Sequence, residues 1–317
     1  MRRLEVQPFA DEHLDAAAAL LAERHARQRA TEPLLPEIAD FRAHVEESLG
    51  ADGASGWVAL QDGDVVGYVI GAPRSNEIWG PNIWVELAGH AVRDAETIRD
   101  LYAVAAASWV EGGATRHYVL APATDVELVD SWFRLSFGAQ HALGIQEVAD
   151  QRDVSGEDIT VRRAGPEDAE AAVRLDLVLP EHQRGSPVFG VTQNPNEEES
   201  TAEYREALAE EGEAILLAER DGRPIGLLVM APIERSSMHT GLARPDRACI
   251  LGFAATLPDV RGSGAGLALT NAGLAWAREQ GYETVVTDWR ETNLLSSRFW
   301  PKRGFRRTFL RLYRSIP

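Results

Sequence analysis

The residues best suited to chemistry form a glycine-rich turn, Arg261-Gly262-Ser263-Gly264-Ala265-Gly266, which separates an apolar run from a helical pattern. Small residues let consecutive backbone N–H groups point into one concavity, and the first N–H groups of a helix have no partners within it. A pyrophosphate satisfies such donors, helped by the helix dipole and here by the charge of Arg261. The turn therefore predicts an anion site, although it is neither a P-loop nor a dinucleotide-binding turn, whose glycine spacings differ.

A second pattern lies downstream of this turn. The β-branched run Thr284–Trp289 is typical of a strand, and Asn293–Phe305 is typical of a short helix that ends at Gly304. The two patterns resemble the Arg/Gln-x-x-Gly-x-Gly/Ala turn and the Asn-x-x-Ala-x-x-Phe-Tyr-x-x-x-Gly-Phe segment of the GCN5-related N-acetyltransferases, the GNAT superfamily. The resemblance implies a strand, a phosphate-binding turn and a helix that together hold acetyl coenzyme A.

The resemblance also implies which residues contact this co-substrate. Backbone N–H groups near the end of the first strand would polarise the thioester carbonyl, and Asn293 would touch the pantetheine or phosphate end. The predicted contacts are Thr256, Leu257, Arg261, Gly262, Ser263, Gly264, Ala265, Gly266, Leu267 and Asn293. No metal is expected, and the single cysteine, Cys249, excludes a cysteine zinc site.

The catalytic residues are harder to assign, because the sequence departs from the family pattern at two places. Trp300 occupies the position of the tyrosine acid, and its indole N–H does not give up a proton near neutral pH. The strand Ile250–Leu257 carries no carboxylate, where many relatives have a glutamate base. The candidate bases are therefore Glu234 and His239, with Asp246 and Asp288 as alternatives. The candidate acid is Tyr313, with Ser297 as the alternative.

The acceptor would meet a carboxylate and aromatic rings. Asp288 could bind a cation, and the rings of Trp289 and Trp300 could form a wall that receives a cation on its face. We predict these three residues as substrate contacts.

Internal repetition indicates how the chain is divided. Gly56–Pro73 resembles Ala214–Pro232: Asp62-Gly63, Gly67 and Ala72-Pro73 match Asp221-Gly222, Gly226 and Ala231-Pro232 at one constant offset. Each copy has an Asp-Gly turn between two strand-like runs, which predicts a β-hairpin. A length of 317 residues also exceeds what one hydrophobic core usually supports. We predict an α/β fold of two tandem GNAT domains, residues 1–150 and 158–317, each a mixed, mostly antiparallel sheet flanked by helices. The polar segment Ala149–Asp158 would be the linker.

The two predicted domains differ at the turn. The first has Asp94–Arg99 where the second has its glycines, and this segment contains two carboxylates and no glycine. A phosphate about 4 Å from one carboxylate would meet roughly 4 kcal/mol of repulsion at an effective dielectric near 20. The first domain is therefore predicted to be degenerate.

Composition favours a soluble cytoplasmic protein. The formal net charge of −17 repels nucleic acid and anionic lipid and would favour cationic substrates. The N-terminal residues lack the apolar core of a signal peptide, and no long apolar run predicts a membrane span. The expected partner is a small-molecule amine, with no nucleic acid and no membrane. The chain would be a monomer or a homodimer.

The predicted function is direct transfer of an acetyl group from acetyl coenzyme A to a primary amine of a small cationic acceptor in the C-terminal domain. Two alternatives remain at this point. The chain could be a non-catalytic module that binds or senses acyl coenzyme A, or an acetyltransferase similar to mycothiol synthase.

Overall fold

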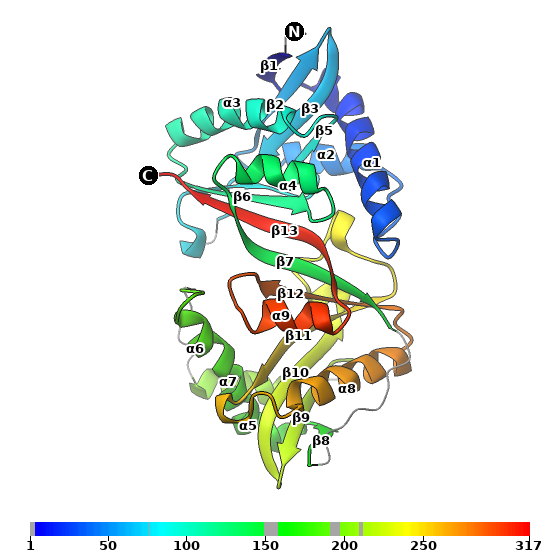
Figure 1. The fold of residues 1–317 in the computed structure, drawn as a ribbon, viewed down its shortest axis with the longest axis vertical. Coiled ribbons are helices and arrows are strands. Elements are labelled where there is room, and N and C mark those ends of the chain that lie inside the picture. The colour runs from blue at the N-terminus through cyan, green and yellow to red at the C-terminus, as the bar shows by residue number, and fades with distance from the viewer. Residues whose placement is uncertain (1–3, 76, 149–157, 191–196, 209–211) are drawn as a thin grey trace. The chain divides into compact units, whose positions relative to one another are not determined.

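A computed structural model describes residues 4–75, 77–148, 158–190, 197–208 and 212–317. The chain divides into two compact units (Figure 1). The first contains Met1–Leu143, Thr240–Arg244 and Arg307–Pro317, and the second contains Gly144–His239 and Pro245–Arg306. The predicted linker, residues 149–158, lies outside the described residues except at its last position.

The first unit has an antiparallel sheet with the strand order β1 (Leu4–Pro8), β2 (Ser55–Gln61), β3 (Asp64–Gly71) and β5 (His90–Val92). Figure 1 shows α3 (Thr97–Glu111) on one side of this sheet and α1 (Leu14–Thr31) and α2 (Phe41–Leu49) on the other. The unit also contains β4 (Asn82–Val85), which pairs in parallel with β6 (Arg116–Pro122), and the helix α4 (Val126–Phe133). The strand β7 (Gly138–Glu147) passes from the first unit into the second.

The last strand, β13 (Arg306–Ser315), pairs in antiparallel register with β6, from Phe309 opposite Pro122 to Ser315 opposite Arg116. The strand β13 therefore belongs to the first unit from Arg307 onward, although it follows the second unit in the chain.

The second unit has the strand order β12 (Thr284–Arg290), β11 (Ala248–Thr256), β10 (Arg223–Pro232), β9 (Ala214–Arg220) and β8 (Thr160–Arg163). These neighbours are antiparallel except β11 and β12, which are parallel. Figure 1 shows α8 (Ala265–Glu279) on one side of the sheet and α5 (Ala169–Asp176), α6 (Val178–Arg184) and α7 (Glu197–Ala207) on the other. The short helix α9 (Ser296–Lys302) follows β12.

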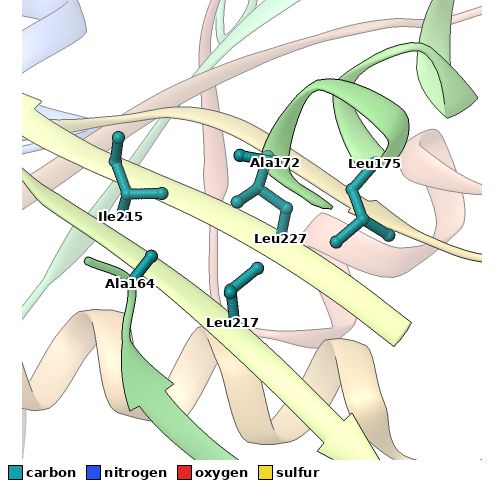
Figure 2. Close-up of a cluster of buried hydrophobic side chains, with 6 residues drawn as sticks. All are labelled: Ala164, Ala172, Leu175, Ile215, Leu217 and Leu227. Carbon is teal, nitrogen blue, oxygen red and sulfur yellow. The ribbon is translucent and has the colours of Figure 1, made fainter. Parts of the chain in front are cut away.

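A buried apolar cluster joins α5 to the sheet of this unit (Figure 2). Ala172 and Leu175 of α5 contact Leu217 of β9 and Leu227 of β10, and these four side chains are at most 2% exposed. Burial of apolar surface stabilises this contact at about 25 cal/mol per Å². The cluster fixes α5 on the face of the sheet where the site described below lies.

Both predicted hairpins are confirmed. Their turns are Asp62-Gly63 and Asp221-Gly222, and all four residues have positive φ angles between 53° and 92°. This is the backbone of a type I′ turn, which asparagine, aspartate and glycine tolerate best and whose twist matches that of the strands. The predicted α/β fold, with sheets flanked by helices, is also confirmed.

Among the described residues, no helix is both long enough and apolar enough to span a membrane.

Candidate active site

The strands β11 and β12 separate part-way along their length. Their parallel ladder runs from Ala248 opposite Thr284 to Leu251 opposite Thr287 and ends there. On the other side, Val229 and Met230 of β10 are opposite Phe253 and Leu251, so Gly252 is the extra residue of a β-bulge. A bulge leaves backbone groups of the extra residue without a ladder partner. Beyond Leu251, β11 keeps β10 as its ladder partner on one side only.

The glycine-rich turn follows β11 and leads into α8. Gly262 has a φ angle of 80°, and Gly264, the residue before the helix, has one of 96°. No atom lies within 4 Å of the point where a Cβ atom would stand on either residue, so both face open space. Oγ of Ser263 is buried and has no hydrogen-bond partner among the described residues. The turn therefore has an unused donor and room for an anion at a helix N-terminus.

A cavity of about 410 Å³ lies against this turn, and we call it the glycine-turn cavity. Its walls come from α6, the end of β11, the start of α8, and α9 with the loop before it. The lining residues are Val178, Leu179, His182, Ala254, Ala255, Thr256, Arg261, Gly262, Gly264, Gly266, Leu267, Leu269, Asn293, Leu295, Ser296, Phe299, Trp300 and Arg303.

Two guanidinium groups line the glycine-turn cavity. Arg261 is in the turn itself, and Arg303 follows α9. The guanidinium of Arg303 lies 5.4 Å from the ring of Phe299, and that ring is 3.5 Å from the Cβ position of Gly266. The Nε atom of Arg303 is buried and has no hydrogen-bond partner among the described residues. Arg303 therefore adds a second positive charge close to the turn.

The side chain of Asn293 holds the entrance of α9 in place. It is 2% exposed, and its Oδ1 accepts hydrogen bonds from the N–H groups of Leu295 (3.1 Å) and Ser296 (3.5 Å). Nε2 of His182, on α6, lies 3.2 Å from the same oxygen. Asn293 thus lines the cavity and also fixes the backbone at the start of α9, which forms part of the cavity wall.

A second cavity, of about 630 Å³, lies over β10 and β11, and we call it the acidic cavity. Four carboxylates and one guanidinium line it, and the Arg235 guanidinium pairs with Glu213 (Nε to Oε1, 2.8 Å). Gly252 and Phe253 of β11 line the acidic cavity, and the next residue, Ala254, lines the glycine-turn cavity. The lining residues are Glu203, Tyr204, Glu206, Ala207, Glu213, Val229, Ala231, Arg235, Ser236, Ser237, Met238, Ile250, Gly252, Phe253 and Asp288.

Comparison with known families identifies this part of the chain. The model of a family described as "Acetyltransferase (GNAT) family" matches residues 178–305, a range that contains the turn and every lining residue of both cavities. This part of the chain belongs to the GNAT superfamily. GNAT enzymes transfer acyl groups from acyl coenzyme A. The buried, unpartnered Ser263 hydroxyl, the open space at Gly262 and Gly264, and the two arginines fit the pyrophosphate of that molecule.

Solved structures share the fold over nearly the whole chain. A GCN5-related N-acetyltransferase from Sphaerobacter thermophilus is 13% identical, with a TM-score of 0.57, and the match covers 99% of this chain and 96% of that one. A GCN5-related glucosamine N-acetyltransferase region of a fungal multi-domain GH3 β-N-acetylglucosaminidase is 16% identical, with a TM-score of 0.53. That match covers 99% of this chain and 38% of the fungal one. No curated protein has significant sequence similarity to the chain.

Most of the predicted co-substrate contacts line the glycine-turn cavity of the GNAT domain. Three of them do not: Leu257, Ser263 and Ala265. The N–H of Leu257 donates to the carbonyl of Ile225 at 2.9 Å and is therefore engaged in the structure. Ala265 is 2% exposed within the first turn of α8, whereas Ser263 stands between the two glycines that face open space.

The predicted substrate contacts fall in three places. Asp288 lines the acidic cavity, and Trp300, 7% exposed, lines the glycine-turn cavity. Trp289 lines neither cavity: its ring packs so closely on Gly144 that any side chain there would clash, and its Nε1 donates to Glu291 at 2.9 Å. Their roles toward an acceptor stay predictions.

The leading catalytic candidates, Glu234, His239 and Tyr313, do not line either cavity of the GNAT domain. Glu234 is exposed in the turn after β10. His239 is 1% exposed, and its Nδ1 lies 3.0 Å from Oγ of Ser236. Tyr313 belongs to the first unit, where its ring lies 5.0 Å from that of Tyr118. The catalytic roles of these three residues also stay predictions.

Sequence reasoning missed Arg303, and it did not pair His182 with Asn293. Arg303 had a weak signal, since it follows Phe299 by four residues and so shares a helix face with it. The His182–Asn293 contact had none, because 111 residues separate the two.

In the first unit, the start of α3 carries carboxylates where the GNAT domain has its turn. Oδ1 of Asp94 accepts a hydrogen bond from the N–H of Glu96 at 2.9 Å. The Glu96 carboxylate pairs with Arg134 and Arg99, and the hydrogen bond from Arg134 is the main reason that the pKa of Glu96 lies below its usual value. The N–H group of Glu96 is thus already bonded to Asp94. Two carboxylates, those of Asp94 and Glu96, lie at the start of this helix, where an anion would need donors.

Proposed function

We propose that the chain is an N-acetyltransferase that transfers the acetyl group of acetyl coenzyme A directly to a primary amine of a small cationic acceptor. One observation carries the proposal: two cavities with opposite charge in their linings are lined by consecutive residues of β11, Phe253 and Ala254. One cavity offers donors and arginines for an anion, and the other offers carboxylates for a cation. We place the reaction in the predicted C-terminal domain, 158–317, and give the degenerate domain, 1–150, a supporting role.

The glycine-turn cavity is the proposed site of acetyl coenzyme A, which supplies the activated acyl group. Gly262, Ser263 and Gly264 would donate to its pyrophosphate, and Arg261 and Arg303 would balance the negative charge. Leu267, Leu269 and Phe299 offer apolar wall for the rest of the molecule.

The bulge at Gly252 provides the proposed donors for the reacting carbonyl. Backbone N–H groups that lack ladder partners stabilise a developing oxyanion well, because they are fixed before the reaction begins. Gly252 and Phe253 line the acidic cavity, and Ala254 lines the glycine-turn cavity.

The acidic cavity is the proposed acceptor site. Its four carboxylates outnumber its one guanidinium, which is already paired with Glu213. Glu203 and Glu206 are three residues apart on α7 and so share a helix face, and Asp288 belongs to β12. An ammonium group would be attracted to this cavity and a carboxylate would be repelled.

A second candidate function is non-catalytic binding of acyl coenzyme A. Trp300 favours it, since the indole lines the glycine-turn cavity at the position of the family's tyrosine acid and cannot protonate a leaving thiolate.

An acetyl-transfer assay separates the two functions. The purified chain would be incubated with acetyl coenzyme A and 1,4-diaminobutane, n-butylamine or β-alanine, and the release of free thiol would be followed. The thiol of Cys249 is buried and adds little background. We expect the highest kcat/KM for the diamine and the lowest for the amino acid. Tight binding of acetyl coenzyme A with no transfer to any of the three amines would contradict the proposal and favour the binding module.

A further inference from the structure

Two residues at the acidic cavity form a hydrogen-bonded pair that no step described so far uses. Tyr204, on α7, lines the cavity, and its hydroxyl donates to the carboxylate of Asp176, on α5. The body of Tyr204 packs on the apolar cluster of Figure 2, as do Val229 and Phe253, which line the same cavity. Tyr204 therefore lines the cavity with its body packed on apolar side chains and its hydroxyl bonded to Asp176.

The surroundings of this pair favour a neutral phenol and a proton-accepting carboxylate. Burial raises the pKa of the Asp176 carboxyl, and the hydrogen bond from Tyr204 opposes that effect only in part. Burial, together with the charge of Asp176, raises the pKa of Tyr204 above its usual value. A carboxylate with increased proton affinity is a better general base than an exposed one, because its pKa is closer to the pH at which it works.

Among the carboxylates of this region, Asp176 stands apart. Glu203 and Glu206 are exposed on α7, where they can attract a cation but are surrounded by water. Asp176 is partly buried beside Leu175, and it reaches the cavity lining through the Tyr204 hydroxyl. A simple packing contact between α5 and α7 would need neither a phenol hydroxyl nor a carboxylate, whose burial costs free energy.

We propose that Tyr204 and Asp176 form a proton relay that removes the proton from the acceptor's ammonium group. The proposal rests on the function proposed above. The ammonium N–H bond breaks as its proton moves to the Tyr204 oxygen, while the phenol proton moves to the Asp176 carboxylate. The nitrogen lone pair then forms the C–N bond, and the electrons of the C–S bond leave with the thiolate. The attacking nitrogen loses its second proton, which reaches the thiolate through solvent, so the products are a neutral amide and free coenzyme A thiol. Asp176 ends as a neutral acid and returns its proton to solvent.

The first test compares Tyr204→Phe and Asp176→Asn with the wild-type chain, using 1,4-diaminobutane as the acceptor. Loss of a general base typically costs a factor of 10² to 10⁴, so we expect kcat to fall by about 100-fold. The KM for the diamine and the affinity for acetyl coenzyme A should stay within about threefold. Tyr282→Phe is the matched control, since Tyr282 is also a partly buried tyrosine of the second unit but lines neither cavity. Its kcat should equal that of the wild type.

The second test separates a proton relay from a merely structural pair. In 2,2-difluoro-1,4-diaminobutane the amine beside the fluorines is largely neutral at the assay pH, and the other amine keeps its charge. An acceptor that is already neutral needs less help from a base, so the defect of both variants should shrink to below about tenfold. Equal defects with both diamines would overturn the relay, as would a wild-type kcat in Tyr204→Phe.

Failure of the relay is distinguishable from failure of the proposed function. A wild-type chain that acetylates neither diamine overturns both, whereas an active wild type with unaffected variants overturns the relay alone. Tyr204→Phe removes a single oxygen from a side chain that packs on the apolar cluster, so it keeps the test decisive if Asp176→Asn fails to fold.

Discussion

Nε2 of His182 lies 3.2 Å from Oδ1 of Asn293, and this contact joins two segments that are 111 residues apart in the chain. It ties α6 to the entrance of α9 across the glycine-turn cavity. The same Asn293 oxygen accepts from Leu295 and Ser296, so the contact fixes two walls of the cavity at once.

Loss of this contact should weaken co-substrate binding. We expect His182→Ala to lower the affinity for acetyl coenzyme A about fivefold, because one hydrogen bond contributes about 1 kcal/mol. His182→Gln keeps an N–H donor near Asn293 and should bind within about twofold of the wild type. Calorimetric titration measures both. Equal losses in the two variants would show that the contact with Asn293 does not matter for binding.

Asn293→Ala should be more damaging to stability. It removes the acceptor of the partly buried N–H groups of Leu295 and Ser296, and the loss of such a hydrogen bond costs about 1 kcal/mol. Urea unfolding of the second unit, followed by circular dichroism, should show the lower midpoint. An unchanged midpoint would mean that other groups satisfy these donors.

The charges of the acidic cavity should set the preference for cationic acceptors. Asp288→Asn and Glu203→Gln should each raise the KM for 1,4-diaminobutane about two- to fivefold, as expected for partly solvated ion pairs. Glu283→Gln is the control, since Glu283 is an exposed carboxylate of the same unit outside both cavities. Added salt should reduce the difference. A KM that is insensitive to both cavity substitutions would place the acceptor elsewhere.

A histidine of the first unit should make stability depend on pH. His90 is fully buried, and burial, with a smaller effect of Arg24, lowers its pKa to about 3. Its pKa in the unfolded chain is near 6.5, so below that pH the unfolded state binds the extra proton and gains stability. The contribution of neutral His90 is complete above pH 6.5 and declines toward pH 3, by about 2 kcal/mol at pH 5.

Denaturant unfolding of the first unit at pH 7.5 and pH 5 measures this decline. His90→Gln keeps a donor for the carbonyl of Leu120 but does not titrate, so its loss between the two pH values should be about 2 kcal/mol smaller. Equal losses in the variant and the wild type would show that His90 takes no part in the pH dependence.

Local patterns predicted the elements that make up the fold. The Asp-Gly dipeptides at 62–63 and 221–222 require positive φ angles, so the hairpins could be read from the sequence. The partner of β13 could not, because the apolar pattern of a strand does not say which neighbour it pairs with. The bulge at Gly252 was equally hidden, since it depends on the register between β10 and β11.

The sequence predicts those parts of the candidate site whose residues are neighbours in the chain. The turn from Arg261 to Gly266 was found, whereas Tyr204 and Asp176 were not, because their meeting depends on how α5 and α7 pack on the sheet. Glu234 and His239 were chosen for their chemistry and their place near the sheet. The direction of a side chain in an irregular loop is set by tertiary contacts, such as that between His239 and Ser236.

The measurement that tests the central claim most directly is calorimetric titration with acetyl coenzyme A of the wild type and of Gly264→Asp. The substitution puts a carboxylate into the proposed phosphate site, where repulsion of about 4 kcal/mol is expected at 4 Å. Gly281→Asp is the matched control, since Gly281 also has a positive φ angle and open space but lies past the other end of α8. We predict one site per chain, lost in Gly264→Asp and kept in Gly281→Asp. Two sites, or equal affinity in both variants, would contradict the account.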